Sequence, residues 1–238
     1  MHPIERLRYV ARSAGGDPRS LIAETASGLC ALGDNPAGMV VACRRLVERH
    51  PTSGPMWWLC AHLLTAADPQ AVAQLLVDAI FDDPTPEVLA AAIPANAGVC
   101  VIGWPEQAGD WLLVRDDVHV IDVRSCIDDP VGLATALRDA DLVLVEALAA
   151  SSTEILATRG SAAAAAAAAA SGVPVWAVIG TGRCLPDAGF QTLVDAGADV
   201  VQLARCSHRV SPAGLRQLGE GEAPLAAECP LAPELIKR

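Results

Sequence analysis

Four short, largely apolar runs in the second half of the chain constrain the fold more than any other feature. They cover residues 99–102, 118–121, 142–145 and 175–179, and they lack the polar alternation of a strand that faces water on one side. Helical stretches at 129–139 and 161–171 lie between the later runs. Alternation of buried strands with helices predicts a parallel, Rossmann-like sheet with crossover helices, and we expect a last strand near residues 200–203.

The N-terminal third has a different period. From Ile4 to about Leu89 apolar residues recur at helical spacing, and prolines or Asp-Pro and Asn-Pro pairs separate the segments. The expected helices begin at or near Ile4, Pro18, Pro36, Pro55 and Pro69. The pattern therefore predicts an α/β protein with a helical domain over residues 1–92, followed by a Rossmann-like domain over 93–238.

Composition excludes several classes of protein. No apolar run approaches the roughly 20 residues of a membrane span, and the first residues lack the apolar core of a signal peptide, so we expect a cytoplasmic protein without membrane contact. The net charge of −11 removes the electrostatic basis for non-specific binding to nucleic acid. An anionic ligand would instead need a local basic pocket.

The residues that most often hold metals or cofactors are scattered. The eight cysteines form no CxxC pair and the five histidines are isolated, which favours reduced core thiols and predicts no metal site. Gly180-Thr181-Gly182 lacks the third glycine of a dinucleotide fingerprint, and the chain has neither a Walker-type loop nor a Gly-x-Ser-x-Gly elbow. We therefore predict no cofactor.

Ligands of such sheets bind beyond the carboxyl ends of the strands, so the turns after the strands hold the candidate residues. Arg124 and Arg183 can each make a bidentate contact with a phosphate. The alternative is that these arginines pair with Asp122, Glu146 or Asp187 and close the crevice. The candidate ligand-binding residues in these turns are Arg124, Glu146, Gly180, Thr181, Gly182 and Arg183.

A second candidate is the start of the alanine-rich helix, at Gly160 and Ser161. The first-turn amides of a helix lack partners within the helix and attract anions. We predict that an anionic ligand lies where these amides converge with Arg124 and Arg183. The alternative is a tightly packed helix with an ordinary cap, provided by Thr158 or Ser161.

Several segments resemble the superfamily that joins the regulatory subunits of eukaryotic initiation factor 2B with two sugar-phosphate isomerases, which act on methylthioribose 1-phosphate and ribose 1,5-bisphosphate. Residues 122–125 resemble its Glu-Thr-Arg-Pro, and residues 141–148 its Asp-x-Val-Leu-Val-Gly-Ala-Asp. Residues 157–161 resemble its Asn-Lys-x-Gly-Thr, 172–174 its Gly-x-Pro, and 210–212 the start of its Val-x-Pro-Pro. The chain is diverged and shortened, with one strand–helix unit missing between Arg124 and Leu142.

The resemblance implies a helical N-terminal domain, and in the isomerases a cysteine and an aspartate as the proton-transfer pair. Those positions fall on or near Gly103 and on Leu148, neither of which transfers a proton, while Cys100 is a strand residue with an inert thiol. Ala157 and Thr158 replace the substrate-holding Asn-Lys pair. We therefore predict no catalytic residue.

The leading hypothesis is a non-catalytic, initiation factor 2B-like protein that binds a phosphorylated metabolite (a sugar phosphate or nucleotide) or a protein partner. A diverged aldose–ketose isomerase and a structural interaction protein with a vacant cleft are the alternatives. The high apolar fraction with few aromatic residues, together with the resemblance, predicts a homodimer built through the C-terminal domain.

Overall fold

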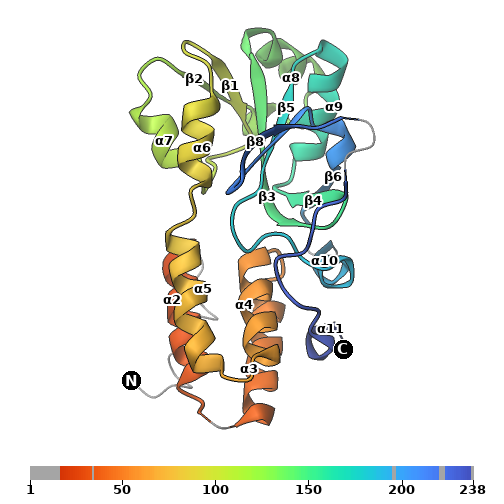
Figure 1. Ribbon diagram of the computed structural model, residues 1–238. Coiled ribbons are helices and arrows are strands. Elements are labelled where there is room, and N and C mark those ends of the chain that lie inside the picture. The colour runs from red at the N-terminus through yellow and green to blue at the C-terminus, as the bar shows by residue number, and fades with distance from the viewer. Residues whose placement is uncertain (1–16, 34, 195–196, 220–222, 237–238) are drawn as a thin grey trace.

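The N-terminal part of the molecule is helical, as predicted. The computed structural model describes residues 17–33, 35–194, 197–219 and 223–236, so the helix expected near Ile4 lies outside the described residues. The described helices of this part are α2 (Pro18–Cys30), α3 (Pro36–Arg49), α4 (Gly54–Thr65), α5 (Pro69–Phe81) and α6 (Thr85–Ala92) (Figure 1).

Local sequence explains where these helices start. Helices α2, α3, α4 and α5 each have a proline in the first turn and an N-cap side chain that accepts a hydrogen bond from the first-turn amides. The capping residues are Asp17, Asn35, Ser53 and Asp68. Helix α4 is apolar on almost every side and fills the middle of the bundle, where Trp57 and Leu59 are fully buried.

The second part contains the parallel sheet that the apolar runs predicted. Strands β1 (Gly98–Val101), β2 (His119–Asp122), β3 (Leu142–Ala150), β5 (Val175–Val178) and β7 (His208–Ser211) pair in parallel, and β8 (Gly214–Gln217) adds an antiparallel edge. The strand order is β2-β1-β3-β5-β7-β8. The fold class is therefore α/β with a mostly parallel sheet.

The strand expected near residues 200–203 exists as β6 (Asp199–Gln202), but it lies outside this parallel set. It pairs antiparallel with β4 (Glu154–Ala157), which in turn pairs antiparallel with β3. Strand β3 is nine residues long, and its pairing with β4 shifts register between Ala147 and Ala149. The second half of β3 therefore leaves the parallel sheet and forms a small antiparallel one.

Helices cover both faces of the parallel sheet. Besides α6, they are α7 (Gly109–Val114), α8 (Pro130–Ala136) and α9 (Ser161–Ser171), whereas α10 (Asp187–Val194) and α11 (Pro233–Ile236) pack against the helical bundle. One core joins the sheet to α8 and α9, and another joins it to α6 and α7. Ala164, Ala165 and Ala168 of α9 are fully buried because their methyl groups let the helix approach the strands closely. Among the described residues, no helix is long and apolar enough to cross a membrane.

The two parts share side chains where they meet. The core of the helical bundle includes Leu156 from β4, Phe190 from α10 and Leu235 from α11. Helix α6 contacts β7 and β8 rather than the bundle. The division at residue 92 stays a prediction.

Candidate functional site

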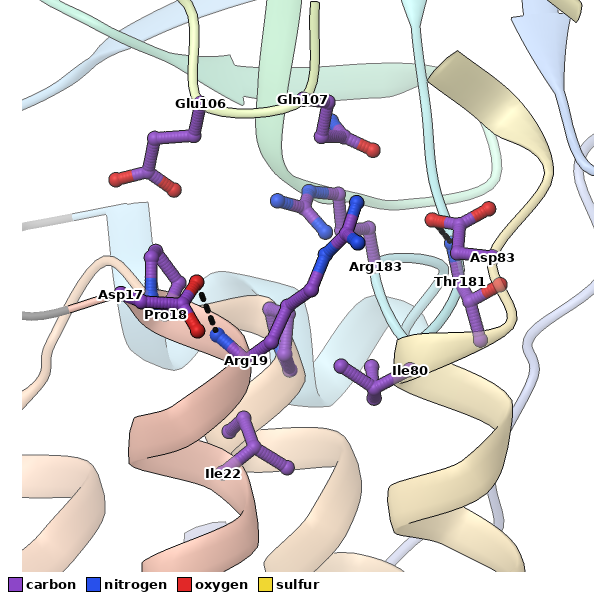
Figure 2. A pocket seen from close by; sticks show the side chains of 11 residues that line it. Asp17, Pro18, Arg19, Ile22, Ile80, Asp83, Glu106, Gln107, Thr181 and Arg183 are labelled. Carbon is purple, nitrogen blue, oxygen red and sulfur yellow. Dashed lines mark hydrogen bonds between the residues drawn. The ribbon is translucent and has the colours of Figure 1, made fainter. Parts of the chain in front are cut away.

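Two hollows adjoin at the carboxyl end of the sheet. The first, which we call the strand-end hollow, is lined by Gly103, Trp104, Glu106, Glu146, Leu148 and Ser161, among others. The second, which we call the crevice, lies between the helical bundle and the sheet, and Arg19, Asp83, Glu106, Gln107, Thr181 and Arg183 are among the residues that line it (Figure 2). Glu106 is common to both hollows.

The N-terminus of α9 does not have the free amides that we predicted. The carboxylate of Asp199, on β6, accepts hydrogen bonds from the N–H of Gly160 at 2.8 Å and of Ala162 at 3.0 Å. Neither Thr158 nor Ser161 caps the helix through its side chain. The chain's own carboxylate thus occupies the position predicted for a ligand, which the sequence could not indicate because Asp199 lies far along the chain.

The amides of the predicted loop at 180–182 are also engaged. The N–H of Thr181 donates to Asp83 at 2.9 Å, and that of Gly182 donates to Glu228 at 2.7 Å. A Cβ at Gly180 would lie 1.8 Å from Oε1 of Gln107, so a side chain here would force Gln107 to move. The loop contributes the shape of the crevice and the Arg183 side chain, rather than free amides.

Arg124 and Arg183 do not converge on one hollow, contrary to the prediction. Arg124 is exposed and its guanidinium lies over Gly103, whereas Arg183 is buried and lines the crevice. Asp122 does not form an ion pair with Arg124 among the described residues, because its carboxylate accepts the backbone N–H of Gly103 and of Arg124, both at 2.9 Å. Ser161 lines the strand-end hollow, apart from Arg183.

Arg183 has the carboxylate partner that the alternative hypothesis named, but the contact is long. One terminal nitrogen lies 4.0 Å from Oε1 of Glu146, while Nε donates to the carbonyl of Ala147 at 2.7 Å. Glu146 also accepts the backbone N–H of Gln107 at 3.0 and 3.1 Å. Burial raises the pKa of the Glu146 carboxyl, against the opposing effects of Arg183 and the Gln107 amide.

Arg19 and Gln107 are among the crevice residues that the sequence did not indicate. Arg19 lies in the first turn of α2, directly after the helix-start signal, and its guanidinium points into the crevice that Arg183 also lines (Figure 2). Gln107 enters from the loop after β1, and its side chain is 7 % exposed. No local pattern marks either residue, because only the fold brings the N-terminal end of α2 to the loop that holds Gln107.

The positions assigned to the proton-transfer pair hold no such group. Gly103 has a φ of 73°, and a Cβ there would lie 1.8 Å from the Arg124 guanidinium, so the backbone and its neighbour both oppose a side chain. Leu148 lines the strand-end hollow. Cys100 is fully buried, and burial raises the pKa of its thiol to about 12, which leaves almost no nucleophilic thiolate at neutral pH.

All eight cysteines are free thiols, and six of them are buried. Among the described residues, histidines, cysteines and carboxylates form no cluster suited to a metal ion.

No family model matches this sequence, and no curated protein matches it either. The architecture nevertheless places the chain in a class of α/β proteins with known structures. Translation initiation factor eIF-2B of Pyrococcus horikoshii superposes with a TM-score of 0.70 at 11% identity, covering 90% of this chain and 96% of that one. For eIF2B beta of Chaetomium thermophilum the TM-score is 0.68 at 14% identity, covering 90% and 88%.

A sugar-phosphate isomerase, the other kind of protein in the predicted resemblance, also has a similar structure. The 5-methylthioribose 1-phosphate isomerase of Pyrococcus horikoshii has a TM-score of 0.58 at 10% identity, covering 90% of this chain and 84% of that one. The chain therefore has the fold shared by eIF2B subunits and this isomerase, which confirms the predicted resemblance at the level of the fold.

Proposed function

We propose that this chain is a non-catalytic, initiation factor 2B-like protein that binds a phosphorylated small molecule, a sugar phosphate or a nucleotide, in the crevice. The observation that carries the proposal is the meeting of Arg19 and Arg183 there, from parts of the chain far apart in sequence. Arg19 forms no ion pair within the described residues, and the partner of Arg183 stands 4.0 Å away. Two guanidinium groups with so little compensation favour an anion between them.

The carboxylates around the crevice leave this preference in place. Asp17 caps α2, and Asp83 accepts hydrogen bonds from Thr85 and from the backbone of Thr181. Both are therefore already used by the fold. Glu106 is exposed, so solvent screens its repulsion of a phosphate. We expect moderate affinity that weakens as salt is added.

The proposed ligand residues combine predicted and newly found positions. Arg183 and Thr181 remain from the sequence prediction, and Arg19 and Gln107 are added. The cavity volume of the crevice is about 50 Å³, and its mouth opens to solvent. This space suits a compact group such as a phosphate, with the rest of a small ester at the mouth, better than a macromolecular segment.

An isomerase remains the second candidate because of Glu146. Side chains two residues apart on a strand point to the same face, so Glu146 presents a carboxyl to the hollow that Leu148 lines. A carboxyl with a raised pKa can transfer protons. Turnover of an aldose phosphate to the ketose that is abolished by Glu146→Gln would establish this second function and refute the first.

Assembly through the C-terminal domain belongs to the same proposal. Trp104, Trp111, Leu113 and Val114 are exposed on and beside α7, and Leu113 is 68% exposed. Clustered exposed apolar side chains favour burial against a second copy or a protein partner. Light scattering should give about twice 24.6 kDa at micromolar concentration, whereas a 24.6 kDa particle would contradict the homodimer.

A thermal-shift screen of sugar phosphates and nucleotides tests the binding proposal, because a ligand of the native state raises apparent stability. Arg19→Ala and Arg183→Ala should each remove the shift. Arg124→Ala and Arg138→Ala are matched controls, since both arginines are exposed and outside the crevice, and should retain it. The absence of a shift with every compound would favour the purely structural hypothesis.

A further inference from the structure

The side chain of Gln107 is anomalous for a buried amide. It is 7 % exposed, yet neither Nε2 nor Oε1 has a partner at hydrogen-bond geometry, although the side chain is near enough to Glu146 to help lower the pKa of that carboxyl. Buried polar atoms almost always have partners, and each one without a partner costs about 1–3 kcal/mol. This amide therefore lowers the stability of the free protein.

The backbone holds this side chain at the wall of the crevice. The N–H of Gln107 donates to both oxygens of Glu146, and Oε1 lies against Gly180, where a Cβ would be only 1.8 Å away. Gln107 lines the crevice together with Arg19 and Arg183, and its carboxamide faces the same space (Figure 2). Both amide atoms are shielded from solvent within this wall, so a group in the crevice reaches the unpaired donor and acceptor only when the side chain turns toward it.

The crevice thus has two chemically different sides. Arg19 and Arg183 form a cationic side, while Oε1 of Gln107 and the exposed carboxylate of Glu106 are the acceptors on the other. Acceptors bind hydroxyl groups, which donate a hydrogen bond, and the Gln107 –NH₂ can donate in return to the hydroxyl oxygen. A phosphate alone would use only the cationic side.

We infer that Gln107 is a specificity-determining residue that reads a hydroxyl group next to the phosphate of the ligand. This inference rests on the proposed function. Gln107 would select phosphate esters of polyhydroxylated compounds over phosphate esters that lack a hydroxyl group. The unpaired amide is retained at a cost in stability because the bound ligand satisfies it.

The test is calorimetry with two probes, ribose 5-phosphate and propyl phosphate, on the wild type, Gln107→Leu and Gln107→Met. The wild type should bind ribose 5-phosphate about tenfold more tightly than propyl phosphate. Both variants should lose that advantage and bind propyl phosphate within about twofold of the wild type. Gln74→Leu, on the exposed surface of α5, is the control and should behave as the wild type.

Stability provides a second, independent measurement. Replacing an unsatisfied amide by an apolar side chain of similar size should leave the melting temperature of the free protein unchanged or raise it. A marked fall in both variants would show that Gln107 is structural and overturn the inference.

The outcomes also separate the inference from the proposed function. If the wild type binds propyl phosphate and ribose 5-phosphate equally, Gln107 does not recognise a hydroxyl group. Only the inference is then overturned. If the wild type binds neither probe, the phosphate site itself is overturned.

Discussion

The N-terminus of α9 and the crevice at Arg183 are both predicted anion sites that follow a strand, but only the crevice keeps groups that a ligand can contact. At α9 the carboxylate of Asp199 accepts the N–H groups of Gly160 and Ala162. In the crevice Arg183 has a carboxylate only at 4.0 Å, and Arg19 adds a second cation.

The difference shows how an acidic chain satisfies its own loops. Asp83, Asp122, Asp199 and Glu228 each accept backbone N–H groups near the carboxyl edge of the sheet. Amides that could hold a phosphate are therefore already paired, and a ligand must rely on guanidinium groups. With a net charge of −11, internal carboxylates are abundant and the arginines decide where an anion can bind.

The largest expected effect comes from Arg183→Ala. Phosphate-ester affinity should fall about 10–100-fold, because a charge-assisted contact is lost. Stability should also fall by about 2–3 kcal/mol, since Glu146 stays buried without its cation. Urea unfolding and calorimetry measure the two losses separately.

The double variant Arg183→Ala/Glu146→Gln sharpens this result. Removing the unpaired carboxylate should restore much of the stability and none of the binding. If binding returned together with stability, the arginine would be structural and the crevice would not be the phosphate site.

Asp199→Ala should have a smaller effect, on stability alone. Loss of the carboxylate leaves two first-turn amides of α9 without their acceptor and should cost about 1–2 kcal/mol in urea unfolding. Affinity for ribose 5-phosphate should stay within about twofold of the wild type. A tenfold change in that affinity would mean that the ligand contacts the start of α9 and would contradict a binding site in the crevice.

The smallest effect is a pH dependence that comes from Glu146. Burial raises the pKa of this carboxyl, so the native state holds its proton more tightly than the unfolded chain does. The stability that this group contributes is therefore present below its ordinary pKa and declines as pH rises through the raised one.

Phosphate affinity should fall over the same range, because an ionised Glu146 competes for Arg183. Unfolding and binding measured between pH 4 and pH 7 should show both slopes, and each should be steeper in the wild type than in Glu146→Gln. The difference between the two proteins isolates Glu146, because Glu228 and the second ionisation of the phosphate ester contribute to both. Equal slopes in the two proteins would assign them to another group.

Much of the fold could be predicted because a strand that is buried on both faces has a continuous run of apolar residues. The runs at 99–102 and 175–179 became β1 and β5, and the start of α5 and both bounds of α9 agree with the prediction. Strand β7 was missed because only Val210 of its residues is fully buried, while His208 and Arg209 give no apolar run.

The candidate site was less predictable because its partners come from distant segments. Arg183 was found from its place after β5, but nothing near Arg19 in sequence marks it as part of the same crevice. Asp199 and Glu228 accept the amide N–H groups that were predicted to bind a ligand. These hydrogen bonds join residues 39 and 46 positions apart in sequence. Only tertiary packing distinguishes an amide that awaits a ligand from one that a carboxylate already occupies.

The measurement that tests the account most directly is a crystal structure of the protein with ribose 5-phosphate. We predict that the phosphate lies in the crevice, with its oxygens within hydrogen-bond distance of the guanidinium groups of Arg19 and Arg183. A phosphate bound instead beside Arg124 or at the start of α9, with Asp199 displaced, would contradict the account.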